Sequence, residues 1–138
     1  MRSLAAMLMG ALLAASCGSA GGAPGAGGSR CEEVSAQLTD AIAKGLIVPG
    51  GAALRGAQAV KSTIPGRGWY VTADLEGPSF SAKDDLATWT TTDLSGKAKI
   101  FAAGAFAREY SEWESLEGFE HSDDGYAESR ACVTDKLR

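Results

Sequence analysis

A glycine-rich stretch at residues 18–29 divides the sequence and limits where a folded domain can begin. Its twelve residues are six Gly, three Ala, two Ser and one Pro. These side chains bury almost no apolar area, so nothing offsets the entropic cost of ordering the backbone. We therefore expect a flexible linker with a root-mean-square span of roughly 20 Å. The fold must come from residues 30–138, an ordinary length for one domain.

The segment before the linker has the layout of an export signal. Arg2 gives its start one positive charge, and residues 4–16 are thirteen uncharged Leu, Ala, Met, Gly and Ser residues. This run is too short for a transmembrane helix, which needs about 20 apolar residues, but it fits the core of a secretory signal. We expect residues 1–16 to be a signal peptide.

The end of this segment resembles the lipobox of bacterial lipoproteins. In LAASC, residues 13–17, small residues precede a cysteine. In that family the cysteine is acylated and the chain is cut just before it. The resemblance therefore implies a lipid on Cys17 and a tether over 17–29. The alternative is an ordinary secretory signal cut after Ser16.

Two cysteines remain when Cys17 is assigned to lipid. Cys31 and Cys132 lie at the two ends of the 30–138 segment. Because exported proteins commonly carry disulfides, a Cys31–Cys132 disulfide is the simplest prediction. It would close a loop of about 100 residues, worth about 4.7 kcal/mol in the chain-entropy model. A metal site is the alternative, but two cysteines and the distant His121 make a poor ligand set.

The 30–138 segment begins with a pattern typical of an amphipathic helix. Ser29 and Glu32 fit a capping box, and apolar residues then recur at helical spacing as far as Lys44. The pattern predicts a helix over 30–44. Its apolar face is formed by Val34, Leu38, Ala41 and Ile42.

Alternating residues then predict an antiparallel sheet of three or four strands. GWYVTADLEG, residues 68–77, alternates apolar and polar residues as a half-buried strand does. DLATWTTTDL (85–94) and KAKIFAA (97–103) are also typical of strands, with a tight turn at 93–97 between them. Residues 54–61 favour a strand, but their alanine content leaves a helix open.

Two helices are expected after the sheet. Phe106, Tyr110 and Trp113 recur at i, i+4 and i+7, which predicts a helix over 104–115 that packs on the sheet. SDDG at 122–125 is typical of the start of a last helix. The helical spacing there is given by Tyr126, Arg130, Val133 and Leu137. The predicted fold is α+β: the sheet, an N-terminal helix and two C-terminal helices on one face, with the disulfide joining the last helix to the first.

The net charge and its distribution limit the kinds of molecule that this protein can bind. The formal net charge is −4, and it becomes −5 when Arg2 leaves with the signal. Residues 109–128 hold eight acidic residues and no Lys or Arg. Because nucleic acids are bound through Lys and Arg, we expect no nucleic-acid partner. The acidic run is either a solvated surface or a docking surface for a basic protein, peptide or wall component.

No pattern in the sequence predicts catalysis, a cofactor or a metal site. The one histidine, His121, lies in GFEHSDDG with no nucleophile motif in the chain. GRG at 66–68 is typical of a turn rather than a phosphate-binding loop. The aspartate pairs at 84–85 and 123–124 lack the spacing of a calcium loop and are typical of turns and helix caps. We expect a protein that is not an enzyme.

A binding role would need exposed side chains that gather on one surface. The open face of the sheet and the acidic run supply the candidates. They are Tyr70, Trp89, Trp69, Glu112, Glu117, Glu120, Asp123 and Asp124.

The domain also resembles uncharacterised small secreted lipoproteins of high-GC Gram-positive bacteria such as actinomycetes. The stretches that carry the resemblance are CEEVSAQL, AQAVKS, WYVTADLEGP, LATWTT, FAREYSEW and DDGYAESRACV. The resemblance implies a location, the extracytoplasmic face of the bacterial cell membrane, and no mechanism. We expect a lipid-anchored lipoprotein with a non-catalytic binding or structural role in the cell envelope. The alternatives are a small secreted inhibitor or protein-interaction module, and a hydrolase.

Overall fold

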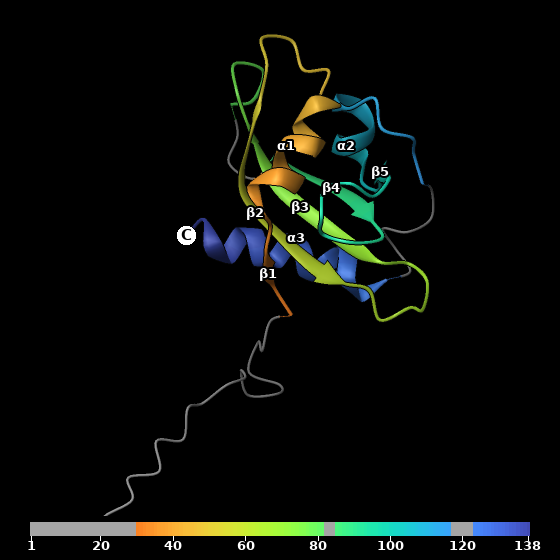
Figure 1. Ribbon diagram of the computed structural model, residues 1–138. Helices are drawn as coiled ribbons and strands as arrows, with labels where there is room; N and C mark the ends of the chain where they lie inside the picture. Colours follow the sequence, from red (N-terminus) through yellow and green to blue (C-terminus); the bar gives the residue numbers. More distant parts are fainter. Residues whose placement is uncertain (1–29, 82–84, 117–122) are drawn as a thin grey trace, which may run out of the picture.

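Five strands form one antiparallel sheet in chain order in the computed structural model, which describes residues 30–81, 85–116 and 123–138 (Figure 1). The strands are β1 (Glu32–Glu33), β2 (Ala53–Lys61), β3 (Trp69–Glu76), β4 (Leu86–Thr91) and β5 (Ile100–Ala102). The helices are α1 (Ala36–Lys44), α2 (Ala105–Tyr110) and α3 (Asp124–Lys136). The α+β class and the strand at 54–61 are confirmed. The sheet has one strand more than expected, because Glu32 and Glu33 pair with β2.

The N-terminal helix begins at Ala36 rather than at residue 30. The residues before it are extended, since Cys31 is bonded to Cys132 and the two glutamates join the sheet edge. Ser35 caps the helix instead of Ser29, and its side chain accepts a hydrogen bond from the Leu38 N–H at 3.2 Å. The predicted helix end at Lys44 is confirmed.

One face of the sheet carries the apolar core. Val71 of β3 and Trp89 of β4 lie opposite each other in register and are both 1% exposed. Leu38 and Ile42 of α1 pack on them, and α2 closes the same side through Ala107. Leu38, Ala41 and Ile42 of the predicted apolar face are confirmed, whereas Val34 packs on the core from a position before the helix.

The opposite face of the sheet is covered by α3. Tyr70, Thr72 and Thr88 point to this side and are each 0% exposed, and the Thr72 hydroxyl lies 2.7 Å from the hydroxyl of Ser129 in α3. Figure 1 shows α3 crossing the strands well away from α1 and α2. The predictions of a half-buried sheet and of all helices on one face are wrong, because the polar side of the strands is sealed by α3.

α3 presents small residues to the sheet. Its buried residues are Gly125, Ser129, Cys132 and Val133, so the helix is turned from the orientation that the sequence predicted. A Cβ on Gly125 would lie 2.9 Å from Tyr70 Cδ2, too close for contact. Cys132 joins α3 to the segment before β1, with the two Cα atoms 5.8 Å apart. The disulfide is confirmed, but it does not join α3 to α1.

α2 ends at Tyr110, five residues before the predicted end at 115. The chain becomes extended at Ser111 and runs beside β5, where the Ala102 N–H donates to the Glu114 carbonyl at 2.9 Å. This segment covers the edge of the sheet that β5 would otherwise expose. Trp113 lies outside the helix and still packs on the core, with its Nε1 donating to the Ile42 carbonyl at 3.1 Å.

Candidate functional site

The candidate aromatic side chains do not form an exposed surface. Tyr70 is 0% exposed and Trp89 is 1% exposed, while Trp69 is half-buried against the core. Lys61 covers the Trp69 ring with its Nζ 6.0 Å from the ring centroid. We expected a contact surface on an open face of the sheet, but α3 covers one face and α1 and α2 cover the other.

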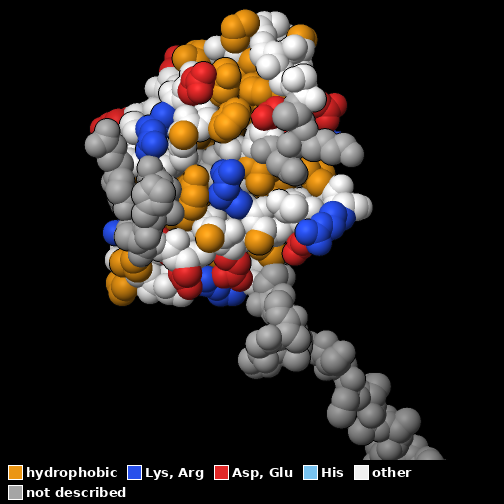
Figure 2. Space-filling view, turned by 180° about the vertical axis from the view of Figure 1, so that it is seen from behind, with side chains coloured by type: hydrophobic (Ala, Val, Ile, Leu, Met, Phe, Trp, Pro, Cys, Tyr) orange, Lys and Arg blue, Asp and Glu red, His pale blue; other side chains and the backbone are white. Residues whose placement is uncertain are grey.

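The acidic candidates are divided by the fold. Asp123 is buried, whereas Glu112 and Asp124 are exposed. Asp124 is paired with Arg30, with 3.1 Å between Oδ2 and Nη2. The candidates Glu117 and Glu120, and with them His121, lie outside the described residues. Figure 2, which views the side opposite to that of Figure 1, shows acidic side chains dispersed among basic and apolar ones.

Asp123 is the centre of a buried polar cluster between α3 and the β2–β3 hairpin. Its side chain is 0% exposed. The Gly125 N–H donates to Oδ1 at 3.0 Å, which caps α3. The Tyr70 hydroxyl donates to Oδ2 at 3.1 Å, Ser62 donates to the same oxygen, and Arg67 Nη1 lies 3.7 Å from it. One carboxylate thus fastens a helix start to two strands.

The protonation states of Asp123 and Tyr70 favour a structural role for this cluster over proton transfer. Burial opposes ionisation of Asp123, but hydrogen bonds from Ser62, from the Gly125 N–H and from Tyr70 outweigh it and lower the pKa of this carboxyl. Burial and the negative charge of Asp123 both raise the pKa of Tyr70. Tyr70 is therefore held as a hydrogen-bond donor and Asp123 as an ion whose oxygens are already occupied.

We expect the free energy of unfolding to fall in acid because the carboxylates of Asp123 and Glu128 become protonated. Burial opposes the ionisation of Glu128, but hydrogen bonds from Arg30 outweigh it and lower the pKa of Glu128. Both folded pKa values lie below the unfolded ones, near 3.9 for Asp and 4.3 for Glu, so the stabilisation is complete above pH ~5. It is lost as the pH falls through the folded values. Urea unfolding between pH 6 and pH 2 measures it, and a free energy of unfolding that stays level below pH 4 would contradict it.

A row of threonines lies under α3. Thr72 of β3 lies opposite Thr88 of β4, with 2.8 Å between the two hydroxyl oxygens. Ser129 of α3 completes the group and donates to the Tyr126 carbonyl at 2.9 Å. Thr90, two residues along β4 on the same face, is 3% exposed and its Oγ1 has no hydrogen-bond partner among the described residues. Such a group is rare in folded proteins, where buried polar atoms are almost always paired.

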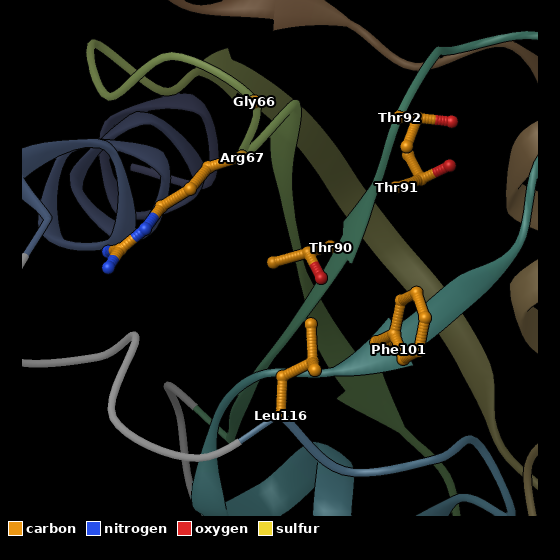
Figure 3. Close-up of a pocket in the computed structure, with 7 residues that line it drawn as sticks. All are labelled: Gly66, Arg67, Thr90, Thr91, Thr92, Phe101 and Leu116. Atoms are coloured by element: carbon orange, nitrogen blue, oxygen red, sulfur yellow. The ribbon is translucent and has the colours of Figure 1, made fainter.

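Thr90 lies in a pocket of about 120 Å³ at the end of the sheet where α3 begins. The pocket is lined by Gly66, Arg67, Thr90, Thr91, Thr92, Phe101 and Leu116. Figure 3 shows Arg67 on one side, Phe101 and Leu116 on the other, and Thr90 between them with its hydroxyl directed to the side of Leu116 and Phe101. None of these residues was a sequence candidate. The TTT run predicts a strand, and nothing in its spacing reveals that β5 and residue 116 bring apolar side chains to Thr90.

Paired substitutions on β4 test the hydrogen-bond assignment. We expect Thr90→Val to raise the free energy of unfolding by about 1 kcal/mol, because it keeps the shape and removes a buried hydroxyl that has no partner in the described part of the chain. Thr88→Val should lower it by about 1–2 kcal/mol, because the hydroxyl of Thr72 loses a buried partner. Urea denaturation of both variants measures the difference. A loss of stability in Thr90→Val would show that its hydroxyl is already paired.

Among residues 30–81, 85–116 and 123–138, no group of three or more His, Cys, Asp or Glu side chains is placed to hold a metal ion. Over the same residues no helix has the length and apolar character to cross a membrane. Comparisons with protein-family models, with curated proteins and with solved structures found no match.

Proposed function

We propose that this chain is a lipid-anchored lipoprotein on the extracytoplasmic face of a bacterial cell membrane. The observation that carries the proposal is the disulfide between Cys31 and Cys132, because such bonds persist in oxidising compartments outside the cytosol. The disulfide accounts for two of the three cysteines in the sequence, and the third, Cys17, comes directly after an apolar, uncharged run. The sequence LAASC at 13–17 supports acylation there.

We propose a non-catalytic binding role for the 30–138 domain. The buried ionisable groups of the α3 interface support it, since Asp123 accepts three hydrogen bonds and Tyr70 is held protonated. These groups stabilise the fold instead of being poised for proton transfer. The pocket beside Thr90 supports binding, because a buried hydroxyl there has no partner among the described residues.

The anchor is tested by intact mass spectrometry of the full chain produced in a bacterial host. We expect the membrane fraction to contain a chain that begins at Cys17 and carries acyl groups. Cys17→Ser should abolish the added mass and release the protein from membranes, whereas a double Cys31→Ser, Cys132→Ser variant should keep the acyl mass. An unmodified Cys17 in the native chain would overturn the anchor and favour an ordinary secretory signal.

A basic protein, peptide or wall component is the proposed partner of the acidic 109–128 region. Exposed Glu109, Glu112 and Glu114 support the proposal, although Glu114 is already paired with Lys99 at 2.7 Å. Oligolysine is a suitable probe. Its binding should weaken as the salt concentration rises and should be reduced by Glu112→Gln. An affinity that does not change with salt, or no affinity at low salt, would exclude electrostatic docking.

A further inference from the structure

We propose that the pocket beside Thr90 binds one neutral, ring-sized apolar group that carries a single hydrogen-bonding atom, as a phenol does. This inference deepens the proposed binding role by naming the ligand class. It rests on the size of the pocket, on its walls, on the charges around it and on a Thr90 hydroxyl that no described residue hydrogen-bonds.

The size of the pocket sets the upper limit. Its volume is about 120 Å³, whereas sites for drug-sized ligands or cofactors span about 300–1,000 Å³. An engineered cavity of about 150 Å³ in another protein accepts benzene. The pocket therefore has room for one monocyclic ring or one branched side chain and is too small for a nucleotide or an oligosaccharide.

The walls set the character of the ligand. Phe101 and Leu116 form an apolar side. Lys99 holds the Phe101 ring, with Nζ 4.6 Å from the ring centroid, and is itself fixed by Glu114. An apolar group that enters between these side chains buries area on both, which favours binding.

Thr90 sets the polar requirement. Its hydroxyl is buried and has no protein partner among the described residues. A buried hydroxyl of this kind needs a water or a ligand atom. A ligand that displaces water must reproduce the hydrogen bond, so an apolar ring with one hydroxyl is preferred over the bare ring.

The charges around the pocket favour a neutral ligand. Arg67 lies 3.7 Å from Asp123, so the guanidinium already faces a carboxylate. Lys99 and Glu114 form a second balanced pair at 2.7 Å. Neither cation adds a net positive field for an anion, and an anionic ring such as benzoate gains nothing there that offsets its desolvation.

The test is a titration of the full oxidised chain with phenol, benzene and benzoate in turn. Binding is detected by two-dimensional NMR from the backbone amide signals of Thr90, Phe101 and Leu116. Phenol should bind at about millimolar concentration and about three- to ten-fold more tightly than benzene, with benzoate weaker than phenol. Thr90→Val should reduce phenol binding to the level of benzene and leave benzene unchanged. Thr92→Val, at an exposed position of the same lining, should change neither.

Several results would overturn the proposal. The role of the Thr90 hydroxyl is excluded if phenol and benzene bind the native chain equally well, or if Thr90→Val leaves the phenol affinity unaltered. The pocket is excluded as the site if the signals that shift belong only to residues outside it. Absence of binding by all three probes excludes the site. Benzene binding by Thr90→Val verifies that this variant is folded. The intact mass of the same protein shows whether Cys17 is acylated. If Cys17 is acylated and no probe binds, the proposed ligand class is overturned while the proposed anchor stands.

Discussion

Replacing both Cys31 and Cys132 with serine should lower the free energy of unfolding by about 4 kcal/mol. The disulfide closes a loop between residues 101 positions apart, so its loss returns a large conformational freedom to the unfolded chain. This is a large share of the stability of a domain of this size, which is usually about 5–15 kcal/mol. Urea unfolding of the full chain measures the change, with Cys17→Ser as the control that should leave it unaltered.

The loss should be concentrated in α3. Thr72, Thr88 and Ser129 make the centre of the α3 interface polar, so this helix has less apolar burial to hold it than α1 has. In the double serine variant, amide hydrogen exchange should accelerate more in α3 than around Leu38 and Ile42 of α1. Equal acceleration in both helices would contradict a local role of the disulfide and leave only its effect on the unfolded chain.

Asp123→Ala should lower the free energy of unfolding by about 3 kcal/mol. The substitution removes the cap of α3 and leaves the buried hydroxyl of Tyr70 without its acceptor. Arg67 loses the carboxylate that it faces at 3.7 Å. The measurement is urea or thermal unfolding, with the slope of the urea transition compared to verify a native-like compact state.

The neighbouring aspartate provides the matched control. The Asp124 side chain is 60% exposed and its partners, Arg30 and Thr63, lie at the surface. Asp124→Ala should therefore cost less than about 1 kcal/mol, as exposed ion pairs usually do. Equal losses for the two variants would show that negative charge at the helix start matters and that the buried cluster does not.

The local elements of this fold follow from the sequence. The strands at 54–61 and 68–77 and the end of α1 at Lys44 were predicted from periodicity and helix-ending residues, and these signals act within a few residues of chain. The start of α1 was predicted less well. Ser29 and Ser35 are both able to cap a helix, and the choice of Ser35 depends on the pairing of Glu32 and Glu33 with β2, which is a distant contact.

The candidate site could not be predicted from the sequence because it also depends on contacts between distant segments. Thr90 resembles its neighbours in a threonine-rich strand, and it differs from them in that its hydroxyl has no hydrogen-bond partner among residues 30–81, 85–116 and 123–138. Phe101 and Leu116 reach it from other parts of the chain. The aromatic candidates Tyr70 and Trp89 were misjudged because alternation identifies the two sides of a strand without showing that helices cover both of them.

The sequence by itself determined the α+β class, the pairing of Cys31 with Cys132 and the order of the elements from α1 to α3. Apolar periodicity and the number of cysteines can be read without knowing which distant segments meet, whereas β1 exists only through its pairing with β2. Only the tertiary structure decided that α3 seals the polar side of the sheet. A helix whose buried residues include Gly125 and Ser129 carries no apolar stripe that predicts docking. The Ser129 hydroxyl meets that of Thr72 on β3, a contact that no pattern in the sequence predicts. At the end of that interface the Thr90 hydroxyl has no partner among the described residues.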